Sequence, residues 1–294
     1  MRLYLECIPC YLRQVLEAMD MFTDDRDQKE KILREVLEAA ATFDAEEIGL
    51  MTNAKIHRIL KKYAPAGDPY KKEKERMNLI CMEMADEIAA MIEGSKNPFE
   101  TALRIALGGN IIDSGQGNDF KAQKIKSTIE YALMQELDED MIVRLKENIA
   151  RAKKILYIGD NTGEIVFDRI FIERFFPADR TIFVVRGGPA MNDATIEDAQ
   201  MIGMTGIVRV ITTGLDMAGA LLPHCSEEFL KEYEDADLII SKGMGNYEAL
   251  SSEDKNIFYL LKVKCPVIEN SFKGRYKLGD IVLDDLKYLK NIDR

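Results

Sequence analysis

The sequence contains no apolar run close to the roughly 18 residues that a membrane-spanning helix requires. Its first apolar stretch is interrupted by Arg2, Glu6 and Arg13, so we expect no secretory signal peptide. The five cysteines are an odd number for a disulfide framework, and without an export signal the chain should meet a reducing compartment. We therefore predict a cytoplasmic protein that has no membrane partner.

Basic residues are the scarcer of the two charge types. The chain has 40 Lys and Arg residues against 51 Asp and Glu residues, which gives a formal net charge of -11. Most of the surface should repel nucleic-acid phosphates, so we expect no nucleic-acid partner. Neither a Walker motif nor a Gly-x-Gly-x-x-Gly motif after the first predicted strand is present, so nucleotide binding loses its usual support. The sequence leaves the oligomeric state open.

The first 150 residues or so read as helical, with apolar positions at three-to-four spacing in residues 10–19, 29–41 and 70–92. The Pro- and Gly-rich segment 65–69 divides them, and Gly94 to Pro98 end the next predicted helix. With 47% hydrophobic residues in 294, the chain can bury a substantial core in one to three domains. We predict one helical domain over residues 1–66 and a second over residues 67–150.

From about residue 152 the pattern changes to short apolar runs, each followed by a Gly-rich turn and a helical stretch. The runs are residues 155–158, 181–185, 207–211, 237–240 and 257–263. This alternation predicts consecutive βαβ units, and therefore a parallel sheet covered by helices on both faces over residues 151–294. In such sheets ligands bind at the carboxyl ends of the strands, so the loops there are the candidate functional segments.

Asp160, Asn161 and Asp193 follow the first two predicted strands. If these strands pair, the three side chains meet at one edge, where two carboxylates and an amide oxygen suit a hard cation such as Mg²⁺ or Mn²⁺. Gly159 and Gly163 permit the turn that this requires. The alternative is that these polar residues only cap the helices that follow each loop.

The loop after the fourth predicted strand begins with Ser241, Lys242 and Gly243. At the end of a buried strand, the Lys242 ammonium can meet a phosphate while loop N–H groups add donors. The alternative is a solvated loop lysine, because most lysines are exposed. Asn246 completes the pocket or starts the following helix.

Two further groups of residues stand out in the helical half. Asn110 lies in a polar cluster, residues 109–115, inside an apolar helix-like run. It either ends a helix or projects across a cleft onto the sheet. Cys7 and Cys10 form a Cys-x-x-Cys pair without a second pair, so a structural metal or a redox role competes with simple burial of both side chains.

Several of these motifs together resemble the damage-control phosphatases, a family formerly called domain of unknown function 89. The resemblance covers essentially the whole chain, and its blocks occur in the same order: Gly109-Asn110-Ile111-Ile112-Asp113, Tyr157-Ile158-Gly159-Asp160-Asn161-Thr162-Gly163-Glu164 with Phe167-Asp168, Asn192-Asp193-Ala194-Thr195, and Ser241-Lys242-Gly243-Met244-Gly245-Asn246-Tyr247-Glu248. Cys7-Ile8-Pro9-Cys10 is similar to the prokaryotic branch, and Lys264-Cys265-Pro266 is similar to another recurring block.

The resemblance implies helical N-terminal domains, a C-terminal Rossmann-like α/β/α domain and a divalent metal on residues matching Asp160, Asn161 and Asp193. It also implies hydrolysis of phosphate monoesters of small metabolites, such as damaged or surplus sugar phosphates. We expect Mn, Mg, Co or Ni as the metal. Water is the expected nucleophile, because an aspartate that ligates a metal is less free to attack.

We assign catalysis to Asp160, Asn161 and Lys242, and we assign substrate binding to Asn110, Glu164, Ser241, Lys242, Gly243 and Asn246. Two other functions stay open at this point. One is an S-adenosylmethionine-dependent carboxyl methyltransferase, although Asp-Asn-Thr-Gly replaces the glycine-rich cofactor loop that such an enzyme would have. The other is a non-enzymatic protein that binds a metal or a metabolite.

Overall fold

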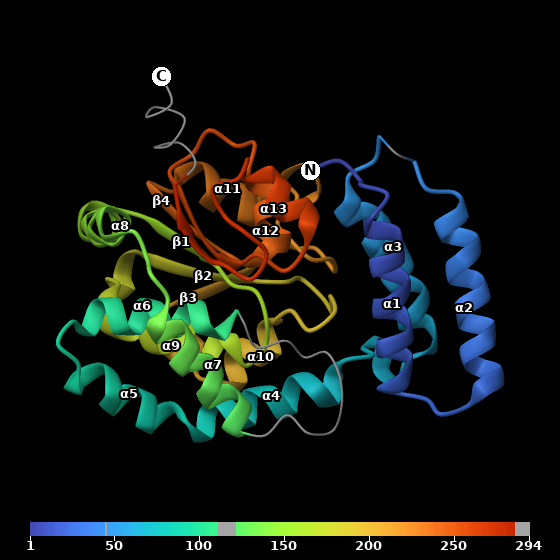
Figure 1. Ribbon diagram of the computed structural model, residues 1–294, viewed down its shortest axis with the longest axis horizontal. Helices are drawn as coiled ribbons and strands as arrows, with labels where there is room; N and C mark the ends of the chain where they lie inside the picture. The colour runs from blue at the N-terminus through green and yellow to red at the C-terminus, as the bar shows by residue number, and fades with distance from the viewer. Residues whose placement is uncertain (45, 111–121, 286–294) are drawn as a thin grey trace.

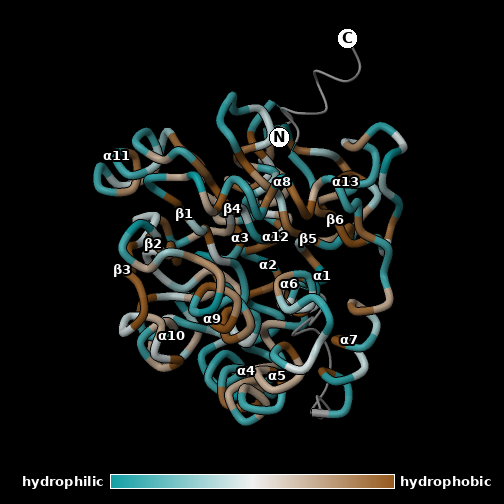
Figure 2. The backbone as a smooth tube through the Cα atoms, turned by 90° about the vertical axis from the view of Figure 1, so that its left-hand side faces the viewer, coloured by the Kyte–Doolittle hydropathy of each residue, from teal (hydrophilic) through white to brown (hydrophobic). Residues whose placement is uncertain are grey.

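A six-stranded sheet lies between two layers of helices in the computed structural model, and α1, α2 and α3 lie beyond one end of the sheet (Figure 1). The structure describes residues 1–44, 46–110 and 122–285. The view in Figure 2 separates the two layers, since α11 and α13 lie on one side of the strands and α4, α5 and α10 lie on the other. This confirms the predicted class, an α/β protein with a helical N-terminal half.

The sheet has the strand order β3-β2-β1-β4-β5-β6. Its strands are β1 (Ile155–Ile158), β2 (Thr181–Val185), β3 (Arg209–Thr212), β4 (Leu238–Lys242), β5 (Ile257–Lys262) and β6 (Ile281–Asp284). The first five pair in parallel, as predicted, and β6 pairs antiparallel with β5. The sequence analysis missed β6, because four residues after a Gly-rich turn carry little periodic signal.

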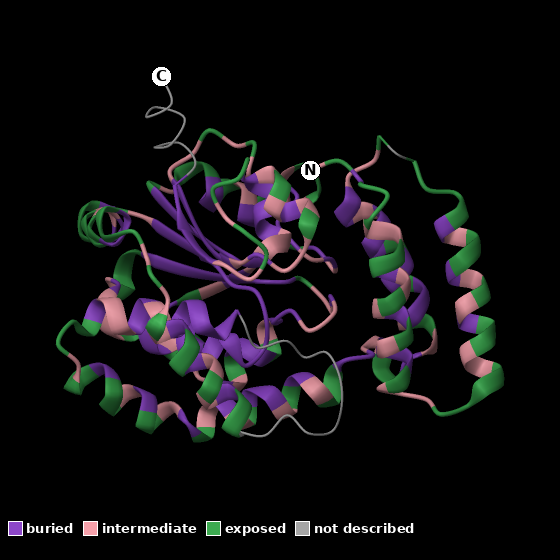
Figure 3. Ribbon diagram, viewed as in Figure 1, coloured by how far each residue is buried: buried purple, intermediate pink, exposed green. Residues whose placement is uncertain are grey.

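Residues of the strands alternate between two hydrophobic cores. Ile155 and Tyr157 of β1 face the helices α4 to α9, whereas Leu156 and Ile158 face α11 to α13. All four are fully buried, and Figure 3 shows the strands buried along most of their length. Burial on both faces is the reason that these strands read as continuous apolar runs in the sequence.

The first three helices, α1 (Cys7–Asp20), α2 (Arg26–Ala41) and α3 (Gly49–Tyr63), enclose a core of their own. Val15, Ile32 and Leu60 are fully buried there. Asp25 caps α2 by accepting hydrogen bonds from two backbone N–H groups of its first turn. The 3₁₀ turn η1 (Pro65–Gly67) follows α3, at the hinge expected from the Pro- and Gly-rich segment.

The next helices pack against the sheet. They are α4 (Lys71–Glu83), α5 (Ala85–Gly94), α6 (Pro98–Gly109), α7 (Ala122–Met134) and α8 (Glu139–Arg151). The single helix expected over residues 70–92 is two helices that meet at Met84. All five contribute residues to one hydrophobic cluster that includes a face of the sheet. The domain limits at 66/67 and 150/151 stay predictions.

The remaining helices connect the strands or follow them: α9 (Glu164–Phe175), α10 (Ile196–Met201), α11 (Glu227–Asp235), α12 (Gly243–Leu250) and α13 (Pro266–Ser271). Short 3₁₀ turns precede β2, β3 and α11, namely η2 (Ala178–Arg180), η3 (Met204–Gly206) and η4 (Leu222–His224). Across the part of the chain that the structure describes, every helix is too short or too polar to cross a membrane.

Leu103 of α6 offers a test of the core between this helix and the sheet, because its side chain is fully buried. We expect Leu103→Ala to lower the free energy of unfolding by about 2–5 kcal/mol, since it removes buried methyl groups and leaves a cavity. Leu16→Ala, at a half-exposed position of α1, should change it by less than about 0.5 kcal/mol. Urea unfolding followed by circular dichroism measures both, and equal effects would contradict this packing.

Candidate active site

Two loops at the carboxyl ends of β1 and β2 are joined by backbone hydrogen bonds. The Ala194 N–H donates to the Asp160 carbonyl at 2.8 Å, and the Thr162 N–H donates to the Asn192 carbonyl at 3.0 Å. Between them, Asn161 and Asp193 form an isolated β-bridge. The prediction that these loops are neighbours is thus confirmed, because β1 and β2 pair directly.

Capping does not explain the polar residues of these loops. Gly163, with φ of 77°, is the residue before α9, and no side chain caps that helix. Helix α10 is capped by Thr195 in a capping box with Asp198. The capping alternative is therefore wrong for Asp160, which does not cap α9, and for Asp193, which does not cap α10.

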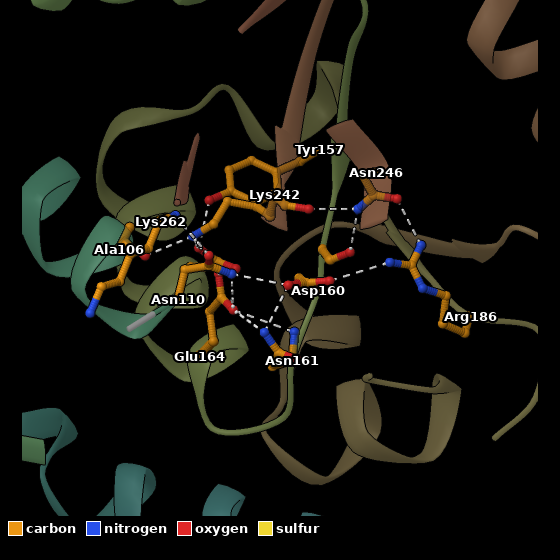
Figure 4. Close-up of polar contacts among 12 residues, drawn as sticks. Ala106, Asn110, Tyr157, Asp160, Asn161, Glu164, Arg186, Lys242, Asn246 and Lys262 are labelled. Carbon is orange, nitrogen blue, oxygen red and sulfur yellow. Dashed lines mark hydrogen bonds and ion pairs between the residues drawn. The ribbon is translucent and has the colours of Figure 1, made fainter. Parts of the chain in front are cut away.

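Three side chains converge on the Asp160 carboxylate (Figure 4). The amide nitrogens of Asn110 and Asn161 donate to its Oδ2 at 3.0 and 2.7 Å. The Arg186 Nη2 donates to its Oδ1 at 3.4 Å. Asp160 is therefore held from α6, from its own loop and from the end of β2.

Arg186 is a residue of this site that the sequence analysis missed. Its guanidinium is 1% exposed, and it donates to Asp193 at 2.6 Å and to the amide oxygen of Asn246 at 3.0 Å, in addition to Asp160. One arginine thus bridges the two aspartates of the neighbouring loops. The available signal was its position directly after the buried strand β2, where a charged residue needs buried partners.

Lys242, the last residue of β4, has no exposed surface. Its ammonium lies 2.9 Å from Glu164 and 2.6 Å from Asp168, and it donates to the Ala106 carbonyl at 2.7 Å. The solvated-lysine alternative is therefore wrong. Its three protons are all directed at protein oxygens, so contact with a phosphate stays a prediction.

Asp168 is the second residue that sequence analysis did not assign to the site. It lies one helical turn after Glu164 on α9, so the two carboxylates share a face. Burial raises the pKa of Asp168 to about 6, against the opposing effect of Lys242. Burial alone would lower the pKa of Lys242, but the charges of Asp168 and Glu164 outweigh it and raise this pKa. Tyr157 donates its hydroxyl to Asp168 at 2.6 Å.

Asn110 both ends a helix and reaches the sheet, so each of its two predicted roles is observed. It is the residue after α6, and its amide nitrogen donates to Glu164 as well as to Asp160. Its amide oxygen accepts from the Lys262 N–H of β5 at 3.1 Å. The rest of the polar cluster, from residue 111 onward, lies outside the described residues.

Gly243, Asn246 and Ser241 surround the end of β4. A Cβ on Gly243 would lie 1.9 Å from the Asp160 Oδ2, so only glycine fits beside that carboxylate. The Asn246 amide nitrogen donates to the carbonyls of Gly159 and Lys242 at 3.1 and 2.7 Å, which ties the ends of β1 and β4 together. The Ser241 hydroxyl is buried and has no hydrogen-bond partner within the described ranges.

The network carries an excess of negative charge. Among the residues that the structure describes, its four carboxylates form ion pairs with two cations, Arg186 and Lys242: the carboxylates are those of Asp160, Glu164, Asp168 and Asp193. The charges of Lys264 and Lys74 also act on Asp160 and Asp193, respectively. Burial, together with the charges of Asp193 and Glu164, raises the pKa of Asp160 well above its usual value, and burial also raises the pKa of Asp193.

This excess of carboxylates over paired cations, with its hard oxygen donors, fits a divalent cation, whose charge would favour the ionised carboxylates. Within residues 1–44, 46–110 and 122–285, no three His, Cys, Asp or Glu side chains are grouped closely enough to hold a metal by themselves. The amide oxygen of Asn161 would therefore complete the set with Asp160 and Asp193. At present its amide nitrogen faces Asp160, so this amide would have to turn.

A cavity of about 670 Å³ borders the site between α4 and the loop after β2. Arg186 and Thr195 lie on its wall next to the aspartates, and Lys71, Lys74 and Glu197 add charges of both signs. The cavity is large enough for a small polar metabolite.

Cys7 and Cys10 lie in the first turn of α1, away from this network, and both are free thiols. Burial raises the pKa of Cys10, and the negative charges of the Cys265 and Cys7 thiolates raise it further. Cys265, which is distant in sequence, therefore lies close enough to Cys7 and Cys10 to affect the pKa of Cys10. A metal or redox role for Cys7 and Cys10 stays a prediction.

The chain is similar to known proteins over nearly its whole length. The family model of the damage-control phosphatase ARMT1-like domain matches residues 3–278. An uncharacterized protein of Methanocaldococcus jannaschii is 40% identical over 90% of each chain. A damage-control phosphatase of Pyrococcus horikoshii is 34% identical over 93% of this chain and 95% of its own.

A second damage-control phosphatase, from Archaeoglobus fulgidus, is 31% identical over 94% of this chain and 96% of its own. The crystal structure of a DUF89 family protein from Pyrococcus horikoshii matches with a TM-score of 0.86 and 32% identity, over 97% of this chain and 99% of that one. The predicted family and enzyme class are thereby confirmed: the chain belongs to the damage-control phosphatase family and is a phosphatase.

Proposed function

We propose that this phosphatase hydrolyses phosphate monoesters of small metabolites with a divalent cation, Mn, Mg, Co or Ni, held by Asp160, Asn161 and Asp193. The observation that carries the proposal is a buried pair of aspartates on two loops joined by backbone hydrogen bonds. In the network around them, four carboxylates form ion pairs with two cations. A bound cation would supply Lewis acidity toward a phosphoryl oxygen.

The residues of the chain would prepare the site for that chemistry. Arg186 holds Asp160 and Asp193 in one orientation, and Asn110 fixes Asp160 from the opposite side. Lys242 pairs with both Glu164 and Asp168 and offsets one of their two negative charges, so it would act as a charge-balancing residue beneath the site. Groups fixed in advance need not reorganise as charge develops during phosphoryl transfer, which is the main source of catalysis in such sites.

The cavity between α4 and the loop after β2 would accept the alcohol part of the ester. Its charged wall favours a polar molecule such as a sugar phosphate over an apolar one. The net charge of -11 argues against a nucleic-acid substrate, and we place the reaction in the cytoplasm. Glu164, Ser241, Gly243 and Asn246 would shape the phosphate side of the pocket.

The two aspartates provide a test of the proposed metal site. We expect Asp160→Asn and Asp193→Asn each to weaken Mn²⁺ binding in calorimetry and to lower kcat/KM for p-nitrophenyl phosphate by on the order of 100-fold, since each loses a charged ligand. Asp179→Asn, at a side chain that is 81% exposed, is the control and should change neither. If the protein hydrolysed neither p-nitrophenyl phosphate nor any of a panel of sugar phosphates with any of the four metals, the proposal would be refuted. Binding of S-adenosylmethionine, detected by calorimetry, would favour the methyltransferase instead.

Gly243 provides a test of the space around Asp160. Gly243→Ala adds a methyl group that displaces the carboxylate, so we expect lower Mn²⁺ affinity and a lower Tm. Gly274→Ala is a matched control, because Gly274 also has a positive φ, of 88°, but has open space around its Cβ position. It should lower only the Tm. Equal Mn²⁺ affinity in the two variants would argue against Asp160 as a ligand.

Lys242 distinguishes charge balance from direct contact with substrate. Lys242→Met leaves two buried carboxylates without their cation, so we expect the free energy of unfolding to fall by about 3–5 kcal/mol. Lys231→Met, at an exposed position of α11, should have little effect in the same urea titration. A variant of undiminished stability that has lost activity would instead place Lys242 in contact with the phosphate.

A further inference from the structure

Helix α4 is hydrogen-bonded to the loop that follows β1. Asn78 has no exposed surface, and its amide oxygen accepts from the Gly163 N–H at 2.8 Å. Its amide nitrogen donates to the Asp198 Oδ1 at 3.0 Å. Both partners are far away in sequence, so one side chain of the helical half joins two separate segments of the α/β half.

Asp198 connects Asn78 to the loop that carries Asp193, the second proposed ligand. The Asp198 Oδ2 accepts from both the N–H and the hydroxyl of Thr195, each at 2.9 Å. Lys74 of α4 lies 3.1 Å from the same oxygen, and it also pairs with Asp68 at 3.3 Å. The charge of the buried Asp198 is therefore compensated, and its position is fixed from two elements.

These contacts fall at equivalent places in the two loops. Gly163 lies two residues after Asn161, and Thr195 lies two residues after Asp193. The same loops are also joined directly, by the hydrogen bond that the Ala194 N–H donates to the Asp160 carbonyl. The link through Asn78 thus fixes their separation a second time, from the side of α4.

The chemistry of an amide suits this position in a way that an apolar or ionised side chain does not. Asn78 accepts a hydrogen bond from a backbone N–H and donates one to a carboxylate, and an amide does both without a charge from two separate atoms. Met77 and Cys81 of α4 already pack close to Gly163, so the helix would stay at this place without a polar link. The hydrogen bonds of Asn78, which need a defined geometry, would also fix how α4 is aligned with the loop after β1.

We propose that Asn78 is a positioning residue for the reaction: acting through Gly163 on one side and through Asp198 and Thr195 on the other, it sets the distance between the loops of Asp160 and Asp193. The inference rests on the proposed cation site. It adds α4 to the elements that determine how well that site binds a cation. Groups hydrogen-bonded directly to metal ligands affect metal affinity or activity by about 10–100-fold in other metal sites, and Asn78 acts one contact further out.

The test is a reciprocal exchange of the two side chains. Asn78→Asp removes the donor and sets two carboxylates against each other, so we expect Mn²⁺ affinity, measured by calorimetry, to fall by about 10-fold, the lower end of the range for groups that contact metal ligands directly. In Asn78→Asp with Asp198→Asn, the new amide donates to the new carboxylate and its oxygen still accepts from Thr195. This double variant should recover most of the lost affinity. Asn97→Asp, an exposed helix cap, is the control and should bind Mn²⁺ as the unchanged protein does.

The outcomes separate this inference from the proposed function. If the unchanged protein binds no divalent cation, the proposed site itself is wrong. If it binds Mn²⁺ and the folded Asn78→Asp protein binds equally well, Asn78 has only a structural role and the inference is overturned. Lower affinity without recovery in the double variant would overturn it as well. Should Asn78→Asp not fold, Asn78→Ser carries the same comparison, because its shorter hydroxyl cannot span both partners.

Discussion

Arg186 and Lys242 bring two positive charges into the interior at the carboxyl edge of the sheet, and four carboxylates surround them. Removing an ion from water costs several kcal/mol unless protein groups replace its hydration. The surrounding structure meets this constraint with amides, a backbone carbonyl and glycines. Ala106 gives Lys242 its third acceptor, and the absence of a side chain on Gly243 leaves room for Asp160.

The helical half completes the site. Asn110 at the end of α6 binds Asp160 and Glu164, and the Ala106 carbonyl of the same helix binds Lys242. Asn78 of α4 adds the link between the two loops. The proposed ligands thus follow strands of the sheet, whereas their hydrogen-bond partners include residues of helices from the N-terminal half of the chain. The hydrophobic cluster that α4 to α8 share with the sheet places these side chains beside the strand ends.

A rigid network of this kind suits the reaction of the family. Phosphoryl transfer requires little covalent chemistry from a protein and depends mainly on charges that are already in position. The cost is a group of buried carboxylates whose pKa values are raised by burial and by one another, as for Asp160 and Asp193. The cation that we propose on Asp160 and Asp193 would offset this cost, because a positive charge beside a carboxylate favours its ionised form.

The sequence by itself determined the five parallel strands and the adjacency of Asp160 and Asp193, because alternating apolar runs and the geometry of parallel sheets are local rules. It also identified the family through ordered motifs. Only the tertiary structure decided the antiparallel β6, the burial of Lys242 and the partners of Arg186, Asp168 and Asn78. A polar residue inside an apolar segment looks the same in sequence whether it is solvated or paired. Its partners, such as Gly163 for Asn78 at a separation of 85 residues, are chosen by the packing of distant elements.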